Sequence, residues 1–229
     1  MSREGSLDLL DEVQECLEAM KRTQQIKPVK VKSMLEHLRS SLEYVANDTY
    51  DKHNLSSEIE RPNIFFPYGK KVFIDNFFTK KLNISPPSSS PLYRIYNSIQ
   101  SYQTGDNWLE MMCNLTNEVK HRHPIPLQED EVTKGVKINF EDVNLITISD
   151  SSNVVFKNFY VNGKKATDFA LQNGRLEIAE NGIPLNFVLS QEKKIRFHGV
   201  DYEVIPFIEE CIKKIKLFIN ESYDVLEKL

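Results

Sequence analysis

The sequence predicts an α+β protein in which a helical bundle is interrupted by a β-rich segment. Apolar residues recur at helical spacing over the first 51 residues, from residue 92 to about residue 119, and again from residue 204 onward. Between these regions, short alternating or β-branched runs are separated by Asn-Gly pairs at residues 162, 173 and 181, which favour hairpin turns. The chain has 229 residues, of which 40% are hydrophobic and 27% are charged. This composition is typical of a folded protein with its own core.

The first 51 residues predict two long amphipathic helices, or one kinked helix. Pro28 interrupts the helical pattern, and a turn at residues 26–28 would let the two helices pack as an antiparallel pair. The two apolar stripes are Leu7, Leu10, Val13, Leu17 and Met20, followed by Met34, Leu35, Leu38, Leu42, Val45 and Ala46.

Residues 52–91 lose this periodicity and predict a long connection with an anchor. Proline and serine accumulate at residues 86–91, and a loop of this length is usually functional or partly disordered. Five phenylalanines indicate that it packs down over the rest of the protein: Phe65, Phe66, Phe73, Phe77 and Phe78.

Helical spacing then returns for a third helical region, which pauses at residues 104–106 and stops at Pro124. After Pro126 the pattern predicts four or five antiparallel strands, within residues 136–140, 145–148, 154–161, 175–178 and 186–189. A long final helix begins near Val204, with Pro206 in its first turn, and should return to the bundle.

Charge and cysteine content exclude several classes of protein. The 29 basic and 33 acidic residues nearly balance, so the surface as a whole does not indicate a polyanion partner. We find neither a signal peptide nor an apolar run of about 20 residues, and we therefore expect a cytoplasmic protein without membrane contact. The three cysteines, Cys16, Cys113 and Cys211, fit buried reduced thiols better than a disulfide framework or a metal site.

The common motifs of catalysis and cofactor binding are missing from the sequence. It contains no P-loop, dinucleotide glycine fingerprint, GxSxG elbow, HExxH, CxxC or paired DxD-type motif, so we expect neither a cofactor nor a metal. Polar residues do interrupt the apolar stripe of the second helix, and His37, Arg39 and Glu43 are candidate binding residues there. Arg39 and Glu43 stand four residues apart and can form an ion pair, which is also a common feature of solvated helix faces.

A second polar cluster ends the third helical region. Asn117, Lys120, His121 and Arg122 crowd what should be a helix C-terminus. Cations are favoured there by the helix dipole, so this pattern has a purely structural explanation. The functional alternative is a histidine that acts as acid or base on an anion held by Lys120 or Arg122.

Four segments in order resemble a widespread group of uncharacterised bacterial and phage proteins. Residues 35–44 resemble their HxLRSALD-type helix, Phe66-Pro67 their F-P dipeptide, residues 99–102 their Q-P-Y segment, and residues 108–122 their NxxKHR helix. The resemblance implies a HEPN-like antiparallel helical bundle. The resemblance covers residues 30–125. Together with the periodicity it predicts a HEPN-like helical region at residues 1–127, a β-rich insert at 128–200 and a C-terminal helix at 201–229 that returns to the bundle.

HEPN ribonucleases commonly carry an R-N-x-x-x-H motif whose arginine binds phosphate and whose histidine assists transesterification. By this resemblance Asn117, Lys120 and His121 are candidate catalytic residues, but Thr116 stands where the arginine would be. Lys120, Arg122 or Arg39 would then have to supply the cation.

Three functions therefore remain open, and the sequence does not decide whether the protein is an enzyme. The first is a binding module for a partner protein, RNA or nucleotide, or small ligand, for example in a bacterial defence or toxin-antitoxin context. The second is a metal-independent ribonuclease that uses His121. The third is a structural homodimer in which the apolar helix faces pair.

Overall fold

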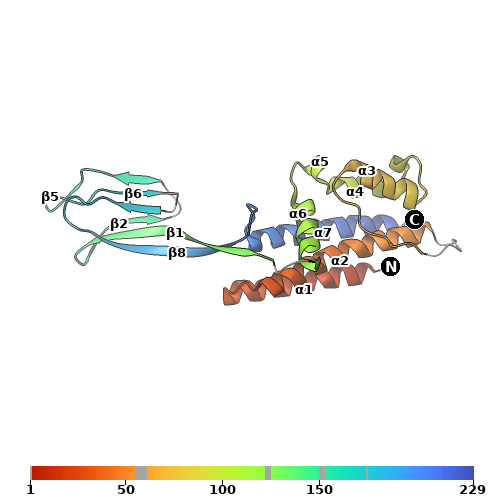
Figure 1. The fold of residues 1–229 in the computed structure, drawn as a ribbon, viewed down its shortest axis with the longest axis horizontal. Helices are drawn as coiled ribbons and strands as arrows, with labels where there is room; N and C mark the ends of the chain where they lie inside the picture. Colours follow the sequence, from red (N-terminus) through yellow and green to blue (C-terminus); the bar gives the residue numbers. More distant parts are fainter. Residues whose placement is uncertain (1, 55–60, 122–124, 150–152, 174) are drawn as a thin grey trace. The chain divides into compact units, whose positions relative to one another are not determined.

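The computed structural model describes residues 2–54, 61–121, 125–149, 153–173 and 175–229. The chain divides into two compact units (Figure 1). One, the helical unit, comprises Met1–Leu127 and Phe197–Leu229, and the other, the β unit, comprises Gln128–Arg196. The protein is α+β.

The helical unit contains three long helices: α1 (Arg3–Thr23), α2 (Pro28–His53) and α7 (Val204–Leu226). They pack against one another, and Figure 1 shows them running side by side. Helix α1 ends before Gln24, which is left-handed at φ 53°, and Pro28 occupies the first turn of α2, where its missing N–H costs nothing. The apolar stripes predicted for α1 and α2 are buried, apart from the half-buried Leu7.

Residues 61–91 of the predicted connection contain short helices, and the third helical region predicted after it is confirmed. The helices of these two regions are α3 (Lys71–Asn76), the π-helical η1 (Phe77–Lys81), the 3₁₀ turn η2 (Pro87–Ser89), α4 (Pro91–Ser98), α5 (Ser101–Thr104) and α6 (Trp108–His121). Helix α6 packs on α2 and α7 and crosses them in Figure 1. An aromatic cluster joins this region to α7, because Tyr96 contacts Phe66, Phe77, Phe78 and Phe218 at ring-centroid distances of 5.3–5.5 Å.

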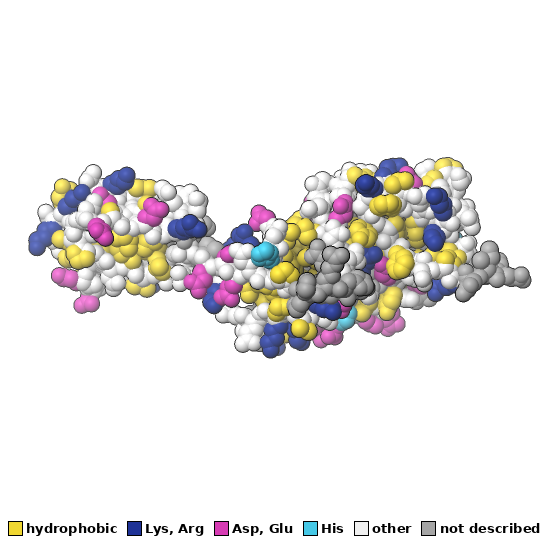
Figure 2. All heavy atoms as spheres, viewed as in Figure 1, with side chains coloured by type: hydrophobic (Ala, Val, Ile, Leu, Met, Phe, Trp, Pro, Cys, Tyr) yellow, Lys and Arg dark blue, Asp and Glu magenta, His cyan; other side chains and the backbone are white. Residues whose placement is uncertain are grey.

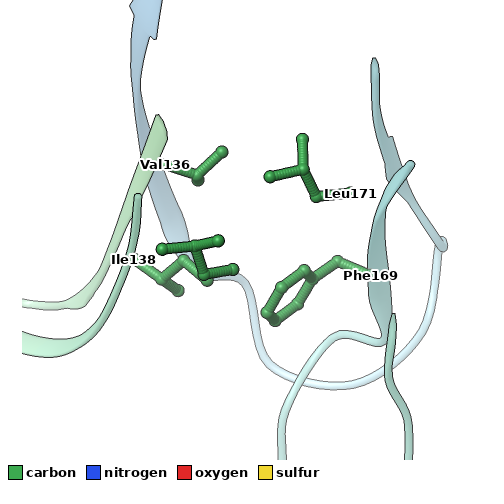
Figure 3. Close-up of a cluster of buried hydrophobic side chains, with 5 residues drawn as sticks. Val136, Ile138, Phe169 and Leu171 are labelled. Atoms are coloured by element: carbon green, nitrogen blue, oxygen red, sulfur yellow. The ribbon is translucent and has the colours of Figure 1, made fainter. Parts of the chain in front are cut away.

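The β unit contains antiparallel sheets with a core of their own. Its strands are β1 (Leu127–Phe140), β2 (Val143–Ser149), β3 (Val154–Phe156), β4 (Tyr160–Val161), β5 (Lys164–Lys165), β6 (Phe169–Gln172), β7 (Arg175–Ile178) and β8 (Asn186–Phe197). One sheet has the order β2-β1-β8, another β3-β6-β7, and β4 pairs with β5. Figure 3 shows Val136 and Ile138 of β1 facing Phe169 and Leu171 of β6, so the two larger sheets share this core.

The predicted HEPN-like antiparallel bundle with a β insert is wrong. The β-rich region is large and buries its own apolar cluster, so it is a second compact unit rather than an insertion carried by a bundle. In the helical unit, α6 crosses α2 and α7 instead of extending the antiparallel set, and a HEPN arrangement is not shown. Strand β6 was not predicted, because Phe169–Gln172 contains no β-branched residue, whereas the equally short β7 ends in Ile178.

Two further sequence expectations concern the thiols and membranes. Cys113 and Cys211 are buried, Cys16 is half-buried, and all three are free thiols. Among the helices in the described ranges, none combines the length and the apolar character that crossing a bilayer requires.

Candidate functional site

The predicted pair on α2 forms at the centre of a partly buried polar network. Arg39 Nε donates a hydrogen bond to Glu43 Oε1 at 2.7 Å, and the Arg39 guanidinium lies 4.7 Å from the centre of the Tyr68 ring. The side chains of Arg39 and Glu43 are only 12% and 21% exposed, so this pair does not lie on a solvated face. Burial lowers the pKa of Arg39, but Cys113, Glu43 and Tyr68 together raise it above its usual value, so the guanidinium stays charged.

Glu43 also binds the segment at residues 64–69 to α2. Its second carboxylate oxygen accepts the backbone N–H of Phe66, and Asn47 Nδ2 reaches the carbonyl of Ile64 at 3.5 Å. From the other side, the buried Gln100 donates to the Pro67 carbonyl at 3.3 Å and accepts the Gly69 N–H at 3.1 Å. Residues 64–69 are therefore held between α2 and the start of α5.

Tyr68 links α2 to α6. Asn117 Nδ2 of α6 donates to the Tyr68 hydroxyl at 3.1 Å, while the ring of Tyr68 lies under Arg39. Helices α2 and α6 also pack directly against each other. Of the residues singled out in the sequence, the structure thus brings Arg39, Glu43 and Asn117 into one network.

The other sequence candidates are not part of this network as described. The side chains of Lys120 and His121, and all of Arg122, lie outside the described residues. His37 is two residues from Arg39, or about 200° around the helix, and therefore projects from a different face of α2. Thr116 is buried, and its hydroxyl donates to the Met112 carbonyl at 2.7 Å, so an uncharged side chain occupies the position of the family's arginine.

The network offers little for catalysis or anion binding. Burial raises the pKa of the Cys113 thiol to about 12 despite the opposing charge of Arg39, so this thiol stays protonated and is a poor nucleophile. Arg39 Nη1 has no hydrogen-bond partner among the described residues, but it is shielded from solvent. No group of three or more histidines, cysteines or carboxylates within the described parts of the chain is placed to hold a metal ion.

A groove in the helical unit was missed by sequence reasoning. It has a volume of about 490 Å³ and runs between the extended segment at residues 63–67 and the helical segment formed by α3 and η1. Its lining comprises Asn63, Ile64, Phe65, Pro67, Phe73, Asn76, Phe77, Lys80 and Lys81. We call this feature the 63–81 groove.

The prediction that five phenylalanines of this region pack down is wrong for two of them. Phe65 and Phe73 are 68% and 51% exposed, whereas Phe66, Phe77 and Phe78 are buried. In an extended segment alternate side chains point to opposite faces, so Ile64 and Phe66 turn inward and Phe65 turns outward. This period of two at residues 63–66 is the signal that could have identified Phe65 as exposed.

Comparison of the sequence and structure with protein-family models, curated proteins and solved structures gives no match. Function is therefore inferred from the geometry of the described residues.

Proposed function

We propose that this chain is a binding module, and that the 63–81 groove receives an apolar segment of a partner protein. The observation that carries the proposal is the exposure of Phe65 and Phe73 in a concave surface of about 490 Å³. Burying a phenylalanine side chain stabilises a complex by about 1.5–3 kcal/mol, and exposed apolar surface in a groove is typical of interaction sites.

A protein segment fits the groove better than a nucleic acid does. Single-stranded nucleic acids are held by cations that follow the whole backbone, together with aromatic rings on which bases stack. Here the two lysines of the lining, Lys80 and Lys81, are neighbours at the end of η1, and the rest of the lining is apolar or uncharged. The chemistry of the lining is that of a pocket for apolar side chains.

The ribonuclease alternative receives less support from the described residues. Arg39 and Asn117 are engaged with Glu43 and Tyr68, and the buried Thr116 replaces the arginine of the HEPN motif. A role for His121 and a structural homodimer both stay predictions. The enzyme hypothesis requires that the purified protein cleave RNA without metal and that His121→Ala abolish this cleavage while the melting temperature stays unchanged.

The proposal is tested by selecting peptides of about 12 residues from a random phage-displayed library on the purified full chain. Selected peptides should contain apolar residues and should lose binding to the Phe65→Ser/Phe73→Ser double variant. Both side chains are exposed, so this variant should keep the helical content and unfolding midpoint of the wild type.

Val72→Ser provides the matched control. Val72 is 51% exposed and belongs to the same helix as Phe73, but it does not line the groove. Binding of the selected peptides should survive this change. The proposal is overturned by a library that yields no enrichment, or by peptides that bind the double variant as well as the wild type.

A further inference from the structure

We propose that the 63–81 groove recognises an acidic peptide in extended conformation, which adds as a strand along residues 63–65 and places a carboxylate against Lys80 and Lys81. This inference rests on the proposed function and specifies the chemistry and the conformation of its ligand.

The first observation is positive charge in the lining of the groove that no carboxylate of the described residues pairs with. Lys80 and Lys81 are exposed, and no carboxylate among the described residues lies within ion-pair distance of either. Lys71, by contrast, pairs with Asp75 at 3.3 Å on the adjoining α3. Figure 2 shows Lys and Arg side chains beside hydrophobic ones over the α3 and η1 part of the helical unit. An acidic ligand would supply counter-charges to both lysines.

The second observation is the hydrogen bonding of the extended segment. The N–H of Phe66 and the carbonyl of Ile64 face α2, where Glu43 and Asn47 bind them. Exposed and buried side chains alternate over residues 63–66, as they do in an extended chain. In such a chain the backbone groups of successive residues point to opposite sides, so we infer that those of Asn63 and Phe65 point away from α2. No hydrogen bond between described residues uses the backbone groups of Asn63 or Phe65.

This free edge is short and bounded by prolines. Pro62 and Pro67 flank residues 63–66, and Pro67, which lies on the same side as Asn63 and Phe65, lacks the N–H that a continuing edge would need. A peptide that pairs with Asn63 and Phe65 therefore has one favoured register. Main-chain hydrogen bonds would supply affinity, and the groove lined by Phe65 and Phe73 would select alternate side chains.

The test uses fluorescein-labelled peptides of about ten residues that alternate leucine with glutamate, glutamine or lysine. Fluorescence anisotropy with the full chain should show the glutamate peptide binding most tightly, and its affinity should fall between about 50 and 200 mM salt. The Lys80→Glu/Lys81→Glu variant should weaken that peptide about tenfold. Lys70→Glu is the matched control, because Lys70 is exposed next to α3 but does not line the groove, and it should leave the affinity unchanged.

Strand addition is tested with the same glutamate peptide N-methylated at alternate amides. Methylation on the edge that pairs with residues 63–65 should abolish binding, and methylation on the opposite edge should be tolerated. Equal tolerance of both patterns overturns strand addition.

The remaining outcomes separate the inference from the proposed function. If the glutamine peptide binds as tightly as the glutamate peptide and still requires Phe65 and Phe73, acid recognition is overturned and the proposed function stands. If no peptide binds in a manner that depends on these two residues, both are overturned. Tighter binding of an oligouridylate or of phosphatidylserine vesicles than of any peptide also overturns the inference.

Discussion

Arg39 illustrates how a partly buried cation can serve the fold rather than chemistry. One carboxylate, that of Glu43, holds both the Arg39 guanidinium and the backbone N–H of Phe66. The guanidinium in turn covers Tyr68, whose hydroxyl accepts the hydrogen bond from Asn117. Removing one partner of such a pair leaves the other charge without compensation in a partly desolvated site.

Arg39→Met should therefore lower the free energy of unfolding by about 2 kcal/mol, because it leaves the partly buried Glu43 carboxylate without its cationic partner. Urea denaturation measures the loss. The control is Lys32→Met, which removes the exposed ion pair with Glu36, and should cost less than about 0.5 kcal/mol. Equal losses in the two variants would show that the Arg39 network has no special structural role.

At the scale of the elements, an ion pair joins the start of α6 to α7. Lys214 Nζ of α7 lies 2.6 Å from Asp106, which precedes α6, and Thr104 also donates to Asp106 at 2.8 Å. Burial raises the pKa of Asp106, but the hydrogen bonds from Lys214 and Thr104 outweigh it and hold that pKa below its usual value.

Because the pKa of Asp106 is lower in the folded chain than in the unfolded chain, its ionised form stabilises the fold. That contribution is complete at neutral pH and is lost as the pH falls below about 4. Asp106→Asn should therefore reduce the drop in melting temperature between about pH 5 and pH 2. Because Asp106 is partly exposed, the lost stabilisation should amount to less than about 1 kcal/mol. Melting curves across this range measure it. If the melting temperature of the variant drops in parallel with that of the wild type, the ion pair does not contribute. Asp8→Asn, on the exposed face of α1, serves as the control.

Sequence periodicity predicted the elements that are long and one-sided. Helices α1, α2 and α7 carry apolar stripes over several turns, and the β-rich composition between residues 127 and 197 was also predicted. Short elements such as η1 and β6 gave no such signal, because few residues share their period. The resemblance led to the wrong bundle, since local motifs do not determine how helices cross.

The candidate site was foreseeable only in part. The four-residue spacing of Arg39 and Glu43 predicted their ion pair. Tyr68, which connects them to Asn117, lies in a segment without periodicity, so no sequence pattern predicted its position. The exposure of Phe73 likewise depends on how α3 packs on the rest of the helical unit, which is a property of tertiary structure.

At the scale of the whole molecule, the two units have separate apolar cores. The core of the β unit includes Phe169, which is 3% exposed and stacks on Phe156 at a centroid distance of 4.8 Å. The single tryptophan, Trp108, is buried in the helical unit and makes a specific fluorescent reporter of that unit. The unfolding of each unit can therefore be followed in the intact chain.

Phe169→Ala should destabilise the β unit by about 3–5 kcal/mol through the cavity it leaves. Amide hydrogen exchange within residues 128–196 should accelerate, while the urea midpoint of Trp108 fluorescence stays close to that of the wild type. Val155→Ala is the control, because Val155 is 49% exposed and its truncation opens no cavity. If the Trp108 transition moves together with the exchange in the β unit, the two cores unfold as one.

The most direct test of the 63–81 groove is amide hydrogen exchange of the full chain with and without the leucine–glutamate peptide. Protection should appear at the amides of Asn63 and Phe65 and in α3 and η1, because the peptide occupies the edge and the wall that these residues form. It should be absent in the Phe65→Ser/Phe73→Ser variant. Unchanged exchange at residues 63–81, or protection confined to another part of the chain, would contradict the assignment of this groove as the binding site.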